Sequence, residues 1–222
     1  MNSFSHALPY LDRPYFAVGC CVPDLLTAFD RKCRARKKKA ADWTEDDDPL
    51  VRQVARGVVQ HHLDDDWFHR GPSFQRLNQT LAVECRQRFP NDHSMRPSLI
   101  GHVVIEMLLD AYLARKFVGS LEDFYRVVGQ VDPLEVQAAV NRFANRPTSR
   151  LTLAIEKFYE LRYIFDYALD SGVRYRMNRV LERIGLAPLP QAAEPWIATA
   201  RLRVNEHALQ LLHSYAKKLP RP

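Results

Sequence analysis

The sequence predicts an all-α protein, a single-domain helical bundle, from three observations. Apolar residues recur at three- and four-residue spacing over most of the chain, as they do on the buried face of a helix. Only 8 of the 222 residues are glycine, and runs of β-branched residues are scarce, which disfavours a sheet. Helix-start signals are frequent, among them Asp48-Pro49 and Asp132-Pro133, where an N-cap residue precedes a proline at the first helical position.

The first half of the chain contains four expected helices. Pro23 opens the first, Asp48 caps the second and Ser98 caps the fourth. Residues 31–48, which are basic and then acidic, form a charged loop insertion, and 89–97 is a turn region. The expected helices cover 22–32, 50 to about 65, 76–89 and 99–116.

The second half continues the helical pattern. Residues 120–123 (SLED) have the form of a capping box, and Asp132 caps a helix that begins with Pro133. The expected helices cover 121–129, 133–144, 149–170, 172–184 and 196–217. We therefore expect one helical domain over 1–184, together with a tail, 185–222, whose Pro-rich link and C-terminal helix pack on the same domain.

The net charge of +6 at pH 7 arises from one short segment of the chain. Seven cations lie in residues 31–39 (RKCRARKKK), and the remaining 25 Lys and Arg nearly balance 26 Asp and Glu. This basic run is either a solvated loop that pairs with the acidic residues 45–48 or a docking surface for an anionic partner. No aromatic residue interrupts it and no nucleic-acid-binding motif accompanies it, so nucleic-acid binding is disfavoured.

Several other classes of protein are disfavoured by the sequence. No stretch approaches the ~20 uninterrupted apolar residues of a membrane span, and the first residues lack the features of a signal peptide. The four cysteines have no C-x-x-C spacing, which fits a reducing cytoplasm. The motifs of P-loop NTPases, Rossmann enzymes and α/β-hydrolases are absent from the sequence.

Pairs of histidine and carboxylate point to a metal site. His61 and Asp65 are four residues apart on one helical stripe, as are His102 and Glu106 on or beside a second, and such residues lie one above the other. A pair of this kind can supply two ligands to one ion, although it can equally be a local ion pair or a hydrogen-bonded core histidine. His6 and Asp24 also lie among apolar residues. The candidate ligands are His6, Asp24, His61, Asp65, His102 and Glu106.

This mixed imidazole and carboxylate set suits one or two ions of Mn²⁺, Fe²⁺ or Zn²⁺, and its lack of cysteine argues against a closed structural zinc. Asp110 is expected to be a structural or supporting acid. Three residues that flank the stripe are expected to face solvent or support the ligands: His62, Asp64 and Asp66. The histidines without a partner at ligand spacing are expected at the surface or core edge: His69, His93, His207 and His213.

Residues scattered over about 1–184 match, in the same order, residues of a known family. By these residues the sequence resembles bacterial acyl carrier protein phosphodiesterase. The opening MNSFSHALPYL followed by AVGCCVPDLL is similar to the start of that family. His102 and Glu106 stand where the family has two aspartates, and 157–169 (KFYELRYIFDYAL) resembles a later family segment. The matching positions are His6, Gly19, Asp24, Gly57, His61, Asp65, Ala144, Asn145 and Arg146.

The resemblance implies an all-helical, distantly HD-domain-like enzyme that requires a divalent metal, typically manganese. It would hydrolyse the phosphodiester that links 4′-phosphopantetheine to a serine of acyl carrier protein, with the six candidate residues as ligands. Asp65 or Glu106 would then orient or deprotonate the attacking water. Arg146 would clamp the phosphate, unless it is only a surface cation at a helix end.

Under the same resemblance, the basic run Arg31–Lys39 would dock the acidic acyl carrier protein. Two other functions stay open. The metal site could act on another phosphoester, such as a nucleotide or a phospholipid headgroup. The chain could also be a non-enzymatic helical binding protein with a degenerate site.

Overall fold

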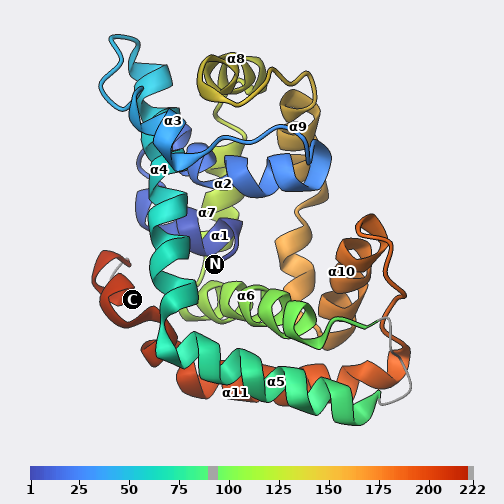
Figure 1. Cartoon of the computed structure of the whole chain (residues 1–222). Helices are drawn as coiled ribbons and strands as arrows, with labels where there is room; N and C mark the ends of the chain where they lie inside the picture. Colours follow the sequence, from blue (N-terminus) through green and yellow to red (C-terminus); the bar gives the residue numbers. More distant parts are fainter. Residues whose placement is uncertain (90–94, 220–222) are drawn as a thin grey trace. The chain divides into compact units, whose positions relative to one another are not determined.

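The computed structural model describes residues 1–89 and 95–219, and the regular structure in these two ranges is helical (Figure 1). The predicted all-α class is therefore confirmed. His93 and part of the predicted turn 89–97 lie outside the described residues.

The chain forms two compact units, and the tail from residue 185 does not form a unit of its own. Unit 1 contains Met1–Trp67, Phe117–Arg162 and the C-terminal end from Lys218, and unit 2 contains Phe68–Lys116 and Tyr163–Lys217. Helices that begin in unit 1 are α1 (Ser3–Ala7), α2 (Pro14–Phe29), α3 (Lys37–Ala41), α4 (Pro49–Arg70), α7 (Ser120–Val128), α8 (Pro133–Phe143) and α9 (Leu151–Leu161). Those of unit 2 are α5 (Pro72–Arg88), α6 (Pro97–Lys116), α10 (Asp170–Arg183) and α11 (Glu194–Leu212).

Helix α2 differs from the helix expected over 22–32, because it begins at Pro14 and contains Pro23 in its interior. Pro14 suits the first helical position, where the missing N–H is not needed. An interior proline loses one hydrogen bond and crowds the carbonyl four residues earlier. Packing of the buried face of α2 against α1, α7 and α9 maintains the helix across this site.

A close approach of α2 and α4 determines where the first candidate ligands lie. A Cβ atom added to Gly57 would lie 2.8 Å from the Cα of Gly19, and one added to Gly19 would lie 2.6 Å from the carbonyl oxygen of Val54. Neither position has room for a side chain. Since residues four apart share one side of a helix, this approach brings His61, one turn after Gly57, against the backbone of α2.

The segment 31–48, expected as a loop, contains the short helix α3 and an anchored stretch before it. Asn145 holds that stretch through three hydrogen bonds. Its backbone N–H donates to the Arg34 carbonyl (3.0 Å), its side-chain oxygen accepts from the Arg34 N–H (2.6 Å), and its amide donates to the Lys32 carbonyl (3.2 Å). Further along, Arg142 pairs with Asp46 at 3.1 Å.

Helix ends follow local signals only in part. Asp132 caps α8 as predicted, because its side chain accepts a hydrogen bond from the Leu134 N–H. The predicted capping box at Ser120 is wrong, because Gly119 in a left-handed conformation is the N-cap residue and the Ser120 hydroxyl donates to the Phe117 carbonyl. The helix expected over 149–170 ends at Leu161, where the next residue turns left-handed.

In unit 2, α6 packs against α5 and α11, which also lie beside each other (Figure 1). The residues of α6 that are fully or almost fully buried include Ile100, Val104, Leu108 and Asp110. By length and hydropathy alone α6 could span a membrane, but half of its apolar window is buried inside the protein, as in a core helix.

Candidate metal centres

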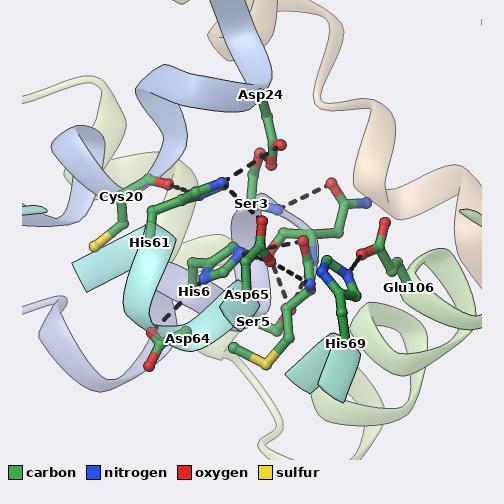
Figure 2. Close-up of polar contacts among 12 residues, drawn as sticks. Ser3, Ser5, His6, Cys20, Asp24, His61, Asp64, Asp65, His69 and Glu106 are labelled. Atoms are coloured by element: carbon green, nitrogen blue, oxygen red, sulfur yellow. Dashed lines mark hydrogen bonds and ion pairs between the residues drawn. The ribbon is translucent and has the colours of Figure 1, made fainter. Parts of the chain in front are cut away.

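The first centre consists of His6 from α1 and His61 and Asp65 from α4, whose side chains point toward one another (Figure 2). Asp65 lies between the two imidazoles, with Oδ1 3.2 Å from His6 Nε2 and Oδ2 3.3 Å from His61 Nε2. One ligand atom from each residue lies within 4.8 Å of the other two. We call these three residues the first trio.

The orientation of His61 is fixed by the backbone of α2. Its Nδ1 lies 2.7 Å from the Cys20 carbonyl oxygen, and a carbonyl can only accept, so Nδ1 carries the hydrogen. The neutral ring therefore has its lone pair on Nε2, which faces Asp65 and, at 4.0 Å, the carboxylate of Asp24. A hydrogen bond of this type is the usual means of orienting a metal-binding histidine.

His6 is fully buried and stacks on His61 with 4.0 Å between the ring centroids. Its Nδ1 lies 3.6 Å from Asp64 Oδ2, an ion-pair distance that is too long for a hydrogen bond. Asp64 is buried. It therefore fits the expectation that it supports the ligands, and not the alternative that it faces solvent. Asp66, in contrast, is exposed and pairs with Lys37.

The electrostatics of the first trio favour a positive charge. Burial lowers the pKa of His6, but Asp64 and Asp65 outweigh this effect and raise it to about 9. Burial raises the pKa of Asp65, but contacts with His6 and His61 hold it well below its usual range. The amino group of Met1 also lies 2.7 Å from Asp65 Oδ1. Asp65 is therefore a carboxylate that attracts cations.

His61 and Asp65 of the first trio line a pocket of about 280 Å³ in unit 1, whereas the fully buried His6 lies behind them and does not line it. Asp24 is on its wall, with a side chain that is 35% exposed and that accepts a hydrogen bond from the Ser3 hydroxyl at 3.0 Å. Asp24 thus lies next to the first trio without being part of it. The residues that line the pocket are Pro23, Asp24, Leu26, Thr27, Arg34, Ala35, Arg36, His61, His62 and Asp65.

The second centre, in unit 2, brings the predicted pair His102 and Glu106 together with His69. Glu106 Oε1 lies 2.9 Å from His69 Nε2 and 3.2 Å from His102 Nε2. We call these residues the second trio. Burial raises the pKa of Glu106, but nearby positive charge, including both imidazoles, holds it well below its usual range.

His69 lies at the edge of the core, as predicted, but the sequence did not indicate that it has a carboxylate partner. Its partner Glu106 lies on a different helix, α6, which spacing within one helix does not reveal. A signal was nevertheless present, because His69 continues the four-residue spacing of His61 and Asp65 by one further step. The four predicted ligands of the N-terminal part thus lie in unit 1, and the other two lie in unit 2 with His69. That all six share one centre stays a prediction.

The second trio also borders a pocket, of about 730 Å³. The ring of Phe74 meets His102 edge-on at 5.0 Å between centroids. Apolar and amide side chains of α5 form much of the wall, including Gln75, Asn78 and Val83. Each trio therefore has a space beside it that a ligand could occupy.

Arg146, predicted as a phosphate clamp, contacts a carboxylate instead. Its Nη2 lies 3.1 and 3.4 Å from the two oxygens of Asp30, which also accepts from the Thr148 hydroxyl at 2.9 Å. Arg146 is not among the described residues that line either pocket. These contacts favour the alternative reading, a cation near a helix end that ties 144–150 to the end of α2.

Comparisons of the chain with protein-family models, with curated proteins and with solved structures found no match. The two trios and their pockets are therefore the features of this structure that bear on function.

Proposed function

We propose that this protein is a metal-dependent hydrolase of phosphoric diesters. The observation that carries the proposal is the first trio, in which two imidazoles and a carboxylate converge beside a pocket. Three protein ligands leave coordination positions for water and substrate, as in catalytic rather than structural sites. The donor set fits Mn²⁺, Fe²⁺ or Zn²⁺.

A bound divalent ion would lower the pKa of a water molecule and polarise a phosphoryl oxygen. The chain's own part is to hold the donors in place. The Cys20 carbonyl directs Nε2 of His61, and Asp64 stands behind His6. In the proposed hydrolysis the water oxygen bonds to phosphorus, the ester P–O bond breaks, and the water proton passes through a carboxylate, Asp65 or Glu106, to the departing alcohol.

The second trio extends the proposal to a second ion. It offers the same ligand types, two imidazoles and a carboxylate, also beside a pocket. We therefore propose a stoichiometry of up to two ions per chain, in which His69 is a seventh ligand beside the six expected from the sequence.

Among phosphodiesters, we favour the bond between 4′-phosphopantetheine and acyl carrier protein, on the strength of the resemblance. Exposed cations of the basic run support this choice, because they would attract an acidic protein: Arg31, Lys32, Lys38 and Lys39. We also propose a cytoplasmic location, since the cysteine pattern fits a reducing compartment.

Elemental analysis of the purified protein tests the metal requirement. We expect near-stoichiometric Mn, Fe or Zn in the wild type and loss of one ion in His61→Ala and in His102→Ala. His207→Ala is the matched control, because this histidine contacts the carbonyl of Arg203 and belongs to neither trio. A wild type without metal that also gains no thermal stability from added divalent ions would overturn the proposal.

Substrate assays with the metal-loaded protein then separate the remaining alternatives. Release of 4′-phosphopantetheine from holo-acyl carrier protein supports the favoured substrate. Hydrolysis of a nucleotide or phospholipid diester alone assigns the same centre to another phosphoester. Bound metal without hydrolysis of any diester favours a binding protein with a degenerate site.

A further inference from the structure

Two arginines of the basic run lie on the wall of the pocket beside the first trio. Arg34 and Arg36 line the same pocket of about 280 Å³ as Asp24, His61 and Asp65. The sequence presented the run as a continuous charged stretch, but the structure divides it between residues that line this pocket and residues that do not.

The local backbone explains this division. Residues 33–36 lie between the end of α2 and the start of α3 without helical structure, and Arg36 is extended. Cys33 and Ala35 are buried, whereas Arg34 is half-buried and Arg36 is exposed. Residues 34–36 all line the pocket, and the two arginines are the charged side chains among them.

This wall is held in place from two sides. The side chain and backbone of Asn145 bind the segment at Lys32 and Arg34. On the other side, His62 Nε2 lies 2.8 Å from the Ala35 carbonyl oxygen, so Nε2 donates the hydrogen bond. These bonds hold the backbone of residues 32–35, and Arg34 Nη1 also donates to the Cys33 carbonyl at 3.3 Å.

The formal charges of the aspartate and arginine side chains that line the pocket cancel. The carboxylates of Asp24 and Asp65 match the guanidiniums of Arg34 and Arg36 in number. A divalent ion at the first trio would leave the pocket with an excess of positive charge. That excess suits a phosphoryl group, and guanidinium binds its oxygens with two parallel hydrogen bonds.

We propose that Arg34 and Arg36 bind the phosphoryl group of the substrate at the first trio. This inference rests on the proposed phosphodiesterase function and deepens it, because it assigns to Arg34 and Arg36 the phosphate-binding role predicted for Arg146. Lys38 and Lys39, which belong to the same run, do not line the described pocket and take no part in this contact.

Phosphate binding by the full-length protein tests the inference. Calorimetric titration with inorganic phosphate is carried out on metal-free and Mn²⁺-loaded protein, for the wild type and for Arg34→Gln/Arg36→Gln. We expect the affinity of this double variant to fall about a hundredfold, tenfold for each arginine, which corresponds to about 1.4 kcal/mol for each. Metal content, measured on the same samples, should not change.

The matched control is Lys38→Gln/Lys39→Gln, which removes the same charge from exposed positions of the same run. It should bind phosphate like the wild type. The conservative variant Arg34→Lys/Arg36→Lys keeps the charge but loses the planar donor pair, and an intermediate affinity is expected. The melting temperature of each variant shows whether it is folded.

The outcomes separate this inference from the proposed function. The inference is wrong and the function stands under one outcome. In that outcome the wild type binds metal and hydrolyses bis(4-nitrophenyl) phosphate, but Arg34→Gln/Arg36→Gln binds phosphate as well as Lys38→Gln/Lys39→Gln does. If the wild type takes up no metal, the function fails, and a loss of phosphate binding confined to the arginine variants still supports the anion site. A wild type that binds no phosphate in either form overturns the inference.

Discussion

Gly57 of α4 lies directly against Gly19 of α2, so closely that a Cβ on Gly57 would come within 2.8 Å of the Gly19 Cα. Because of this contact, the backbone of α2 reaches His61 and its Cys20 carbonyl accepts the imidazole hydrogen bond. Two residues without side chains thus determine the orientation of a candidate metal ligand.

Gly57→Ala should therefore destabilise the fold and impair the first trio together. Overpacking of this kind costs about 1–3 kcal/mol, and separation of the two helices would move His61 away from Cys20. Urea unfolding and metal content measure the two effects. The control is Ala138→Gly at an exposed position of α8. It should lower the free energy of unfolding by about 1 kcal/mol through helix propensity and leave the metal content unchanged. Equal metal content in the two variants would contradict this account.

Asp65→Asn should abolish metal binding at the first trio and also destabilise the metal-free protein. The substitution removes the charge that lies between two imidazoles and leaves the fully buried His6 without one of its two carboxylates. Breaking a largely buried ion pair costs on the order of 3 kcal/mol. Urea unfolding in the presence of a chelator measures this loss of stability without any contribution from bound metal. Unchanged stability there would mean that the imidazoles do not depend on Asp65.

His69→Ala should lower the metal content by one ion per chain, although the sequence alone did not single out this residue. His69 Nε2 lies 2.9 Å from Glu106 Oε1 and completes the second trio. Elemental analysis beside His102→Ala should give the same reduced stoichiometry for both variants. Full metal content in His69→Ala, with loss in His102→Ala, would exclude His69 as a ligand.

Asp30→Asn should reduce stability at neutral pH and have little effect in acid. Burial raises the pKa of Asp30, but the Thr148 hydroxyl and the Arg146 guanidinium outweigh it and lower the pKa below its usual value. A depressed carboxyl pKa stabilises the fold above the unfolded-state pKa of about 3.9, and this contribution is lost as the pH falls through the folded-state pKa.

Urea midpoints of wild type and Asp30→Asn should accordingly differ at pH 7 and converge as the pH falls through the folded-state pKa of Asp30. The control is Asp123→Asn, since Asp123 forms an exposed pair with Arg126 that contributes little. A constant difference between wild type and Asp30→Asn at all pH values would show that the effect is steric and not ionic.

The sequence predicted most of what depends on neighbours within one helix. Periodic apolar residues identified the helices from α4 onward, and four-residue spacing identified His61 with Asp65 and His102 with Glu106, because these contacts are local. The prediction of a helix over 22–32 covers only the last part of α2, since packing overrides the helix-breaking tendency of Pro23.

Contacts between distant segments could not be read in the same way. Spacing along α4 does not show that Glu106 of α6 lies against His69. Composition identified the basic run but could not separate Arg34 and Arg36 from Lys38 and Lys39, because Asn145, more than a hundred residues later, fixes the backbone that divides them. Arg146 had the right chemistry for phosphate, but Asp30 lies beside it.

The segment 33–36 has a consequence for how this protein could diversify. The candidate ligands of the first trio come from α1 and α4, whereas Arg34, Ala35 and Arg36 of the pocket wall come from a short stretch whose backbone is held by Asn145 and His62. Side chains at positions 34 and 36 can therefore be exchanged without disturbing that anchorage or the ligands. Substitutions at these two positions would change the charge of the pocket wall while leaving the residues of the first trio in place.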